Sequence, residues 1–211
     1  RGIYDNLRKF VNYLLSSNFA EILVIFLAMV IFAPFFGLGL PLTPIHILWI
    51  NLVTDGLPAV ALGVDPFQKE IMKRKPREYE ESIINKEMII SILTLGMLVA
   101  LVVLFLFWSY RNAIPGKAQT MVFTALVVFE LVRLHMIRMH YHLSIFSNGY
   151  LVAAVVLSLV LQALVMYVPF LAASFGVVPL GVMDWAWIGL AAAGIVGLNW
   201  VIHRVRKVSF A

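Results

Sequence analysis

Two short groups of polar residues lie inside long apolar runs of this sequence, and both carry oxygen ligands. Asn18 and Glu21 are three residues apart, so a helix places them on one face, about one turn apart. Asn51, Thr54 and Asp55 have the i, i+3, i+4 spacing that puts an amide, a hydroxyl and a carboxylate on one helical stripe. Together the two groups supply hard oxygen donors of the kind that bind cations.

The donor atoms limit which cation these groups can bind. The chain contains no Cys, which excludes thiolate ligands and disulfide bonds, and no close pair of His residues accompanies the two groups. Oxygen donors in this number favour Ca²⁺ over zinc or copper, while Mn²⁺, Na⁺ and protons are compatible with the same side chains. The alternative interpretation is structural, because Asn and Thr also hold membrane helices together by hydrogen bonds.

A helix break is expected next to these ligands. Pro58 has no N–H to donate to the carbonyl of Thr54, and Gly56 loosens the same turn. We therefore predict that the helix unwinds over residues 55–58 and frees carbonyl oxygens. Within a membrane, such breaks occur where the backbone lines a cavity or binds an ion.

The composition indicates that lipid surrounds these elements. Hydrophobic residues make up 62% of the chain, charged residues make up 13%, and the mean hydropathy is +0.95. This is more apolar surface than one soluble core can hide. At about 20 residues per crossing, 211 residues have room for six spans. The formal net charge of +5 is then explained by basic loops of a membrane protein and does not indicate nucleic-acid binding.

Apolar runs bounded by charged, Pro or Gly residues predict an all-α fold, a polytopic transmembrane bundle of six spans. An apolar stripe that extends back to Tyr4 predicts that the first helix begins early, so that residues 1–13 form a cytoplasmic stalk and residues 14–211 form the membrane domain. The spans are expected at about residues 14–36, 44–62, 88–110, 120–139, 150–170 and 185–205.

The distribution of Lys and Arg predicts the orientation of the bundle. Fourteen basic residues fall on one side of the predicted membrane and two, Arg111 and Lys117, on the other. The positive-inside rule makes the basic side cytoplasmic, so both termini are expected in the cytoplasm. The first residues contain no apolar segment followed by a cleavage site, so we expect an internal fragment without a signal peptide.

Four stretches resemble P-type calcium pumps of the sarco/endoplasmic reticulum type. Asn51-Leu-Val-Thr-Asp-Gly-Leu-Pro-Ala-Val-Ala-Leu-Gly63 resembles their sixth membrane helix, and Leu15-Ser-Ser-Asn-Phe-Ala-Glu21 resembles their fifth. Residues 70–77 are similar to the connection between the sixth and seventh helices, and residues 2–6 are similar to the start of the stalk. The order and spacing of the spans extend the resemblance over the whole chain, as the fifth to tenth helices.

The resemblance implies an ATP-driven ion pump, in which an aspartate of a cytoplasmic domain is phosphorylated and dephosphorylated. It implies that Asn18, Glu21, Asn51, Thr54 and Asp55 are calcium ligands, with Asp55 bridging two ions where two sites exist. ATP and Mg²⁺ would act through cytoplasmic domains absent from this segment, which alone is expected to be inactive. Buried carboxylates that lose their cation would take up protons, which predicts proton countertransport.

One position departs from that family. Its two-ion members add a carboxylate near the cytoplasmic end of the eighth helix, where this sequence has residues 133–142, and Glu130 is the only acid in that span. Our hypothesis is that Arg133 or Arg138 neutralises the first ion site and leaves one Ca²⁺ per cycle. The alternative is a local ion pair between Glu130 and Arg133, three residues apart on one helix.

Two other functions are compatible with the sequence. A secondary transporter or channel could use the same polar cluster, but such folds often have paired broken helices, and Pro58 has no counterpart in the fourth or sixth span. A non-transporting module would use the polar groups only for packing. The expected partners are the lipid bilayer and the remaining membrane helices and cytoplasmic domains of the same pump, with no nucleic acid. The expected location is the plasma membrane.

Overall fold

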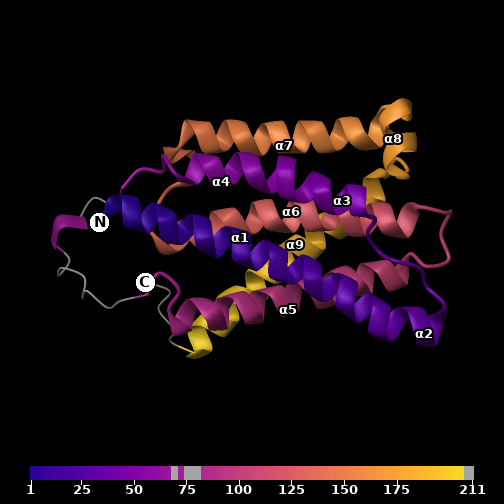
Figure 1. The fold of residues 1–211 in the computed structure, drawn as a ribbon, viewed down its shortest axis with the longest axis horizontal. Helices are drawn as coiled ribbons and strands as arrows, with labels where there is room; N and C mark the ends of the chain where they lie inside the picture. The colour runs from indigo at the N-terminus through magenta and orange to yellow at the C-terminus, as the bar shows by residue number, and fades with distance from the viewer. Residues whose placement is uncertain (68–70, 74–81, 207–211) are drawn as a thin grey trace.

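Figure 1 shows the computed structural model, in which long helices lie side by side in an elongated bundle. The structure describes residues 1–67, 71–73 and 82–206, and this part of the chain contains no β-strand. The segment of residues 70–77 that resembles the family therefore lies mostly outside the described residues. Within them, six helices are long and apolar enough to cross a membrane, which confirms the predicted all-α bundle of six spans: Gly2–Phe36, Pro44–Leu62, Lys86–Ser109, Lys117–His140, Gly149–Tyr167 and Val182–Ile202.

The first span is one continuous helix that begins at Gly2, close to the start that the apolar stripe predicted. It consists of α1 (Gly2–Leu27), a π-helical turn (Ala28–Phe32) and α2 (Ala33–Phe36). Gly37 ends it with a φ of 64°, a left-handed conformation that glycine adopts without strain. That the first turns form a cytoplasmic stalk stays a prediction.

The second span is also helical over its whole length. It consists of α3 (Pro44–Trp49), a π-helical segment (Ile50–Asp55) and α4 (Gly56–Leu62). Pro44 opens the helix at its first position, where no N–H is needed. The short turn between the first two spans makes them antiparallel neighbours.

The predicted unwinding of residues 55–58 is wrong in its form. Asp55 and Gly56 both have right-handed helical dihedral angles, and Pro58 lies inside α4. The departure from α-helix is the π-helical segment that ends at Asp55. In a π-helix, each backbone N–H donates to the carbonyl five residues earlier. This pattern replaces the α-helical hydrogen bonds before Pro58, which has no N–H to donate, so the helix becomes wider here and does not unwind. The π-helical turn of the first span likewise precedes a proline, Pro34.

The remaining helices are α5 (Lys86–Ser109), α6 (Lys117–His140), α7 (Gly149–Tyr167), α8 (Pro169–Phe175) and α9 (Val182–Arg206), with short 3₁₀ turns at Ile71–Lys73 and Ile145–Ser147. Asn85 caps α5, and Asn148 caps α7, because each side chain accepts a hydrogen bond from a backbone N–H of the first turn. The fifth span ends at Tyr167, before the predicted residue 170, because Pro169 begins a separate short helix. The sixth begins at Val182, before the predicted residue 185.

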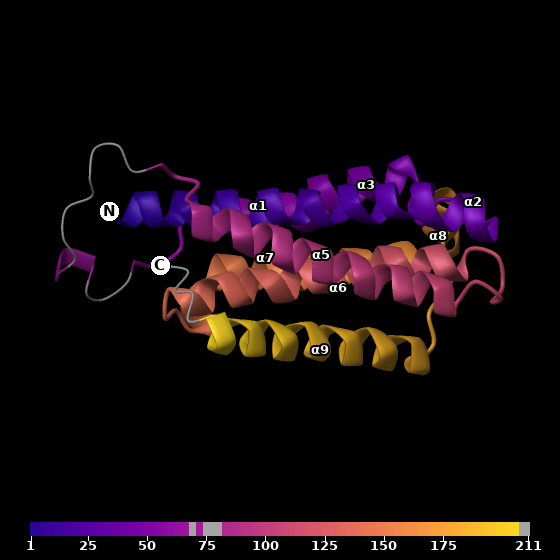
Figure 2. The ribbon, with the colours of Figure 1, turned by 90° about the horizontal axis from the view of Figure 1, so that it is seen from below.

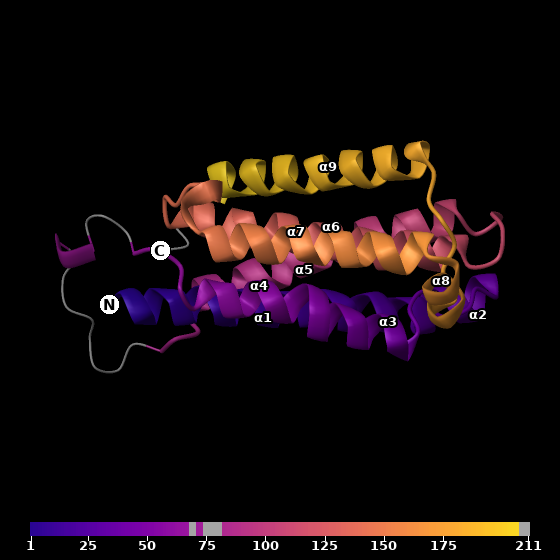
Figure 3. The ribbon, with the colours of Figure 1, turned by 90° about the horizontal axis from the view of Figure 1, so that it is seen from above.

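Helix α6 forms the centre of the bundle. It packs against α1, α5 and α9, and 83% of its most apolar stretch is buried. Figures 2 and 3 show the bundle from opposite sides, with α9 along one edge, α1 and α3 along the other, and α5, α6 and α7 between them. Glu130, Arg133 and Arg138 of α6 are therefore enclosed by neighbouring helices and kept away from the outer surface.

Candidate functional site

The two predicted groups of oxygen ligands meet between α1 and the second span. Glu21 is only 3% exposed, and its Oε2 accepts a hydrogen bond of 2.9 Å from Nδ2 of Asn51. The same Nδ2 donates to the carbonyl of Ile47 at 3.0 Å, one turn earlier on α3. The amide oxygen of Asn51 is thereby turned away from the two acceptors and can serve as a ligand.

Asp55 is fully buried, with no exposed surface. Its Oδ1 accepts a hydrogen bond of 2.7 Å from the hydroxyl of Tyr13, which is itself fully buried in α1. Its Oδ2 has no hydrogen-bond partner among the described residues. Glu21 lies close enough for its charge to act on that of Asp55, so two acids share one buried region.

Several oxygen atoms around Asp55 are buried without a partner in the described part of the chain. They are Oε1 of Glu21, Oδ2 of Asp55, Oγ of Ser17 and both carboxylate oxygens of Glu130. An unpaired buried polar atom costs about 1–3 kcal/mol, and more when it is charged. Oxygen atoms that lack donors and belong mainly to acids are ligands suited to a cation or to protons.

Asn18 and Thr54, the other predicted ligands, lie beside this region without joining its hydrogen bonds. The side chain of Asn18 is half-buried and makes no hydrogen bond with another described residue. Thr54 is fully buried, and its hydroxyl donates to the carbonyl of Ile50 at 2.8 Å. Because that bond uses the hydroxyl hydrogen, the lone pairs of the Thr54 oxygen stay available to a cation.

The acids alone do not form a complete cage. Among the described residues, no three His, Cys, Asp or Glu side chains converge where they could hold one metal ion. A cation bound by Glu21 and Asp55 therefore needs amide, hydroxyl or backbone oxygens to reach the six to eight ligands of Ca²⁺. The geometry fits half of a cation site, with both carboxylates and the amide of Asn51 on adjoining helices.

The structure places Glu130 and Arg133 beside this site from α6. Glu130 is 3% exposed and Arg133 is 4% exposed. The charge of Glu130 acts on Asp55 and Glu21, and the guanidinium of Arg133 interacts with Glu130, Tyr13 and Asp55. Both oxygens of Glu130 and two nitrogens of Arg133 lack hydrogen-bond partners in the described residues, so the two side chains interact through their charges and not through a hydrogen bond.

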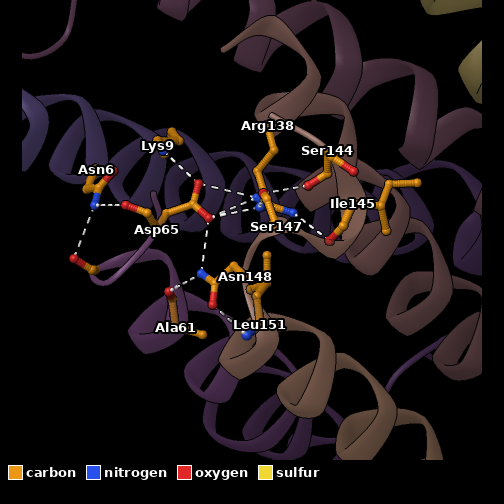
Figure 4. Close-up of polar contacts among 11 residues, drawn as sticks. Asn6, Lys9, Ala61, Asp65, Arg138, Ser144, Ile145, Ser147, Asn148 and Leu151 are labelled. Atoms are coloured by element: carbon orange, nitrogen blue, oxygen red, sulfur yellow. Dashed lines mark hydrogen bonds and ion pairs between the residues drawn. The ribbon is translucent and has the colours of Figure 1, made fainter. Parts of the chain in front are cut away.

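Arg138, the other predicted modulator, lies in a different cluster. Its Nε donates to Asp65 at 3.0 and 3.2 Å, and its Nη2 donates to Ser147 at 2.7 Å (Figure 4). Of the two arginines in the hypothesis, only Arg133 therefore faces Asp55. Gly56 and Pro58, the predicted helix break, follow Asp55 in α4, and Pro58 is buried there.

Sequence reasoning missed Tyr13 and Ser17. The signal was present, because Tyr13, Ser17 and Glu21 are spaced by four residues and so form one stripe along α1. Tyr13 was not singled out because an aromatic residue in an apolar helix is usually a packing residue. The stripe joins the candidate site because the second span brings Asp55 against Tyr13.

Comparisons with known proteins find the same segment elsewhere. The family described as "Cation transporting ATPase, C-terminus" matches residues 39–205. A "Calcium-transporting ATPase" of Bacillus subtilis is 41% identical over 201 residues, which cover 91% of this chain and 22% of that protein. "Calcium-transporting ATPase 1" of Bacillus cereus is 34% identical, covering 98% and 25%. "Calcium-transporting ATPase type 2C member 1" of Mus musculus is 31% identical, covering 98% and 23%. The chain thus spans a quarter or less of the length of these relatives.

Proposed function

Because this chain belongs to the cation transporting ATPase family and matches its C-terminal region, we propose that it is part of the membrane domain of a P-type pump that uses ATP to move Ca²⁺ out of the cytoplasm. The chain would supply most of the ion ligands: Asn18, Glu21, Asn51, Thr54 and Asp55. The observation that carries this proposal is the hydrogen bond between Glu21 of α1 and Asn51 of the second span, beside the fully buried carboxylate of Asp55.

The choice of Ca²⁺ rests on donor type and charge. Glu21 and Asp55 bring two formal negative charges into one buried region. Uncompensated buried charge is strongly unfavourable, so a divalent cation with a preference for oxygen is the matching ligand. The relatives named as calcium-transporting support the same choice. Mn²⁺, Na⁺ or H⁺ on the same scaffold is the alternative.

The position of Arg133 favours one Ca²⁺ per cycle. A second divalent ion would lie beside this buried positive charge, which interacts with Asp55 and Glu130, and like charges repel each other. Arg133 thus takes the place of a second ion, as the sequence hypothesis stated, whereas Arg138 is occupied by Asp65.

Proton countertransport follows as part of the proposal. When the cation leaves, Glu21 and Asp55 remain buried, with hydrogen bonds from Asn51 and Tyr13. Protonation removes the charge that burial disfavours, so protons would return in exchange for the ion. ATP and Mg²⁺ would act through cytoplasmic domains outside this chain, and the chain by itself would not hydrolyse ATP. The proposed setting is the plasma membrane, with both ends of this segment in the cytoplasm.

ATP-dependent uptake of ⁴⁵Ca²⁺ by sealed vesicles that contain the full-length parent protein tests the proposal. The test variant carries Glu21→Gln and Asp55→Asn, which remove both charges and keep the side-chain shapes. The control is Glu87→Gln, which changes an exposed acid at the start of α5. We expect uptake in the wild type and the control, and none in the test variant.

Other outcomes would identify a different function. Uptake that persists in the double variant would remove these carboxylates from the ion path. ATP hydrolysis that is activated by Mn²⁺ or Na⁺ but not by Ca²⁺ would keep the scaffold and change the ion. Cation transport without any need for ATP would favour a secondary transporter.

A further inference from the structure

A second buried polar cluster lies at the end of the bundle where α1 begins, away from the ion ligands. Its centre is Asp65, which follows the end of α4 by three residues and is 2% exposed. Its carboxylate accepts hydrogen bonds from Lys9 Nζ at 2.6 Å, from Arg138 Nε at 3.0 Å and from Asn148 Nδ2 at 3.0 Å (Figure 4). One side chain thus joins α1, α6 and the start of α7 to the end of α4.

The backbone at the end of α4 is held by the same neighbours. Helix ends leave carbonyl groups without partners inside the helix. The side chain of Asn6 in α1 donates to the carbonyls of Gly63 at 3.2 Å and Asp65 at 2.8 Å, and Asn148 donates to the carbonyl of Ala61 at 2.9 Å. The end of α4 is therefore fixed by amides from two other helices as well as by ion pairs.

The cluster lies on the two helices that carry the ion ligands. Lys9 precedes Glu21 by twelve residues in α1, which is about 18 Å at 1.5 Å per residue. Asp65 follows Asp55 by ten residues along α4 and the turn after it. A sliding movement of one helix past the other by one turn, about 5.4 Å, would separate Glu21 from Asn51.

We propose that this cluster is a positioning clamp for ion binding, made of Asn6, Lys9, Asp65, Arg138 and Asn148. It fixes α1 against α4 along their length, so that Glu21 and Asp55 face the same ion. The inference rests on the proposed function, and it adds residues far from the ligands that set the ion affinity. None of the five touches the ion, so each is a positioning residue.

Replacing Lys9 is the sharpest way to open the clamp. Asp65 is held by two cations, so Lys9→Met leaves the neutral pair of Asp65 and Arg138 intact and creates no unpaired buried charge. Asn6→Ala is the second variant, because it removes both hydrogen bonds from α1 to the turn after α4 without changing any charge. The control is Lys117→Met, which breaks an ion pair of 2.9 Å with Asp184 elsewhere in the bundle.

The readouts are the Ca²⁺ concentration for half-maximal ATPase activation, the maximal ATPase rate and the apparent Tm of the full-length parent protein. We expect both clamp variants to raise the half-maximal Ca²⁺ concentration by about fivefold or more, with the maximal rate and apparent Tm close to the wild type. The control should leave the half-maximal concentration unchanged.

The outcomes separate this inference from the proposed function. A lower apparent Tm and maximal rate at an unchanged half-maximal Ca²⁺ concentration would make the cluster a stabilising element only, and would overturn the clamp. An equal shift in the Lys117→Met control would overturn it as well. A wild-type ATPase that is activated by Mn²⁺ or Na⁺ but not by Ca²⁺ would refute the calcium pump. The clamp would then be supported if both clamp variants raise the half-maximal concentration of that ion, and overturned if they do not.

Discussion

The hydroxyl of Tyr13 donates a hydrogen bond of 2.7 Å to Oδ1 of Asp55, so a neutral residue of α1 holds one oxygen of the central carboxylate. The other oxygen, Oδ2, is buried and has no partner among the described residues. The bond therefore limits the rotation of the carboxylate and leaves Oδ2 as the oxygen available to a cation. Tyr13 orients a ligand without being one.

Tyr13→Phe is predicted to weaken cation binding. The change removes the hydrogen bond and retains the ring, so Asp55 loses its orientation while packing is preserved. A hydrogen bond to a charged group contributes about 1.5–3 kcal/mol, so the half-maximal Ca²⁺ concentration of the parent pump should rise by about tenfold or more. Calcium activation of the ATPase measures this directly.

The matched control is Tyr167→Phe. Tyr167 also donates a hydrogen bond of 2.7 Å, but to the carbonyl of Leu180, at the end of α7. The Tyr167→Phe variant should leave the half-maximal Ca²⁺ concentration unchanged. Equal effects of the two substitutions would mean that Tyr13 contributes only to stability.

Arg133→Gln is predicted to strengthen cation binding. Arg133 is a buried positive charge that interacts with Asp55 and Glu130, and it opposes a cation in the same region. A unit charge near such a site changes the binding free energy by about 1–4 kcal/mol, so the Kd for Ca²⁺ should fall by about fivefold or more. Equilibrium ⁴⁵Ca²⁺ binding to the purified parent protein gives both the Kd and the stoichiometry.

The same experiment tests the number of ions. We expect one Ca²⁺ per wild-type molecule, and Arg111→Gln, which changes an exposed arginine after α5, should alter neither quantity. Two ions bound by the wild type would contradict the role of Arg133 as a replacement for the second ion. Weaker binding in Arg133→Gln would show that Arg133 organises the acids more than it repels the cation.

The ligand stripe of the second span could be found from the sequence because spacing alone defines it. Asn51, Thr54 and Asp55 share a helical face in any long helix, and their polarity is conspicuous in an apolar run. The π-helical segment could not be found in this way. Pro58 indicates that one hydrogen bond is missing, but whether the helix opens or widens depends on the packing around it.

The roles of the two arginines of α6 also required the structure. Arg133 and Arg138 are five residues apart, so they point in different directions, but the sequence does not say which direction faces α1. That choice is made by Asp65, which binds Arg138 and leaves Arg133 beside Asp55. Asp65 itself follows a predicted helix end, where an acid usually lies in solvent.

His46→Ala is predicted to destabilise the junction between the second span and α8. Nδ1 of the ring accepts from the N–H of Thr43 at 3.3 Å, so Nε2 carries the hydrogen and donates to the carbonyl of Phe175 at 2.8 Å. The ring also stacks on Phe123, with centroids 4.5 Å apart. Loss of both bonds and the stacking should lower the free energy of unfolding by about 2–4 kcal/mol.

Thermal unfolding of the parent protein in detergent measures this effect, with His142→Asn as the control at an exposed position, where Asn tolerates the backbone φ of 52°. His46→Ala should lower the apparent Tm, and the control should not. The half-maximal Ca²⁺ concentration should change little, because His46 does not touch the ligands. Equal Tm values for the two variants would mean that the Thr43 and Phe175 bonds contribute nothing measurable.

Gly96→Leu is predicted to weaken both packing and cation binding. Gly96 of α5 lies against the ring of Phe19 in α1, where an added Cβ would overlap the ring. A larger side chain has to push α1 away from α5, and overpacking of this kind costs about 1–3 kcal/mol. Because Phe19 lies between Asn18 and Glu21 in the helix, the displacement reaches the ligands themselves.

Gly189→Leu, at a glycine of α9 with open space around it, is the matched control. We expect a lower apparent Tm together with a higher half-maximal Ca²⁺ concentration only in Gly96→Leu, and a normal calcium response in that variant would show that α1 can shift against α5 without disturbing Glu21.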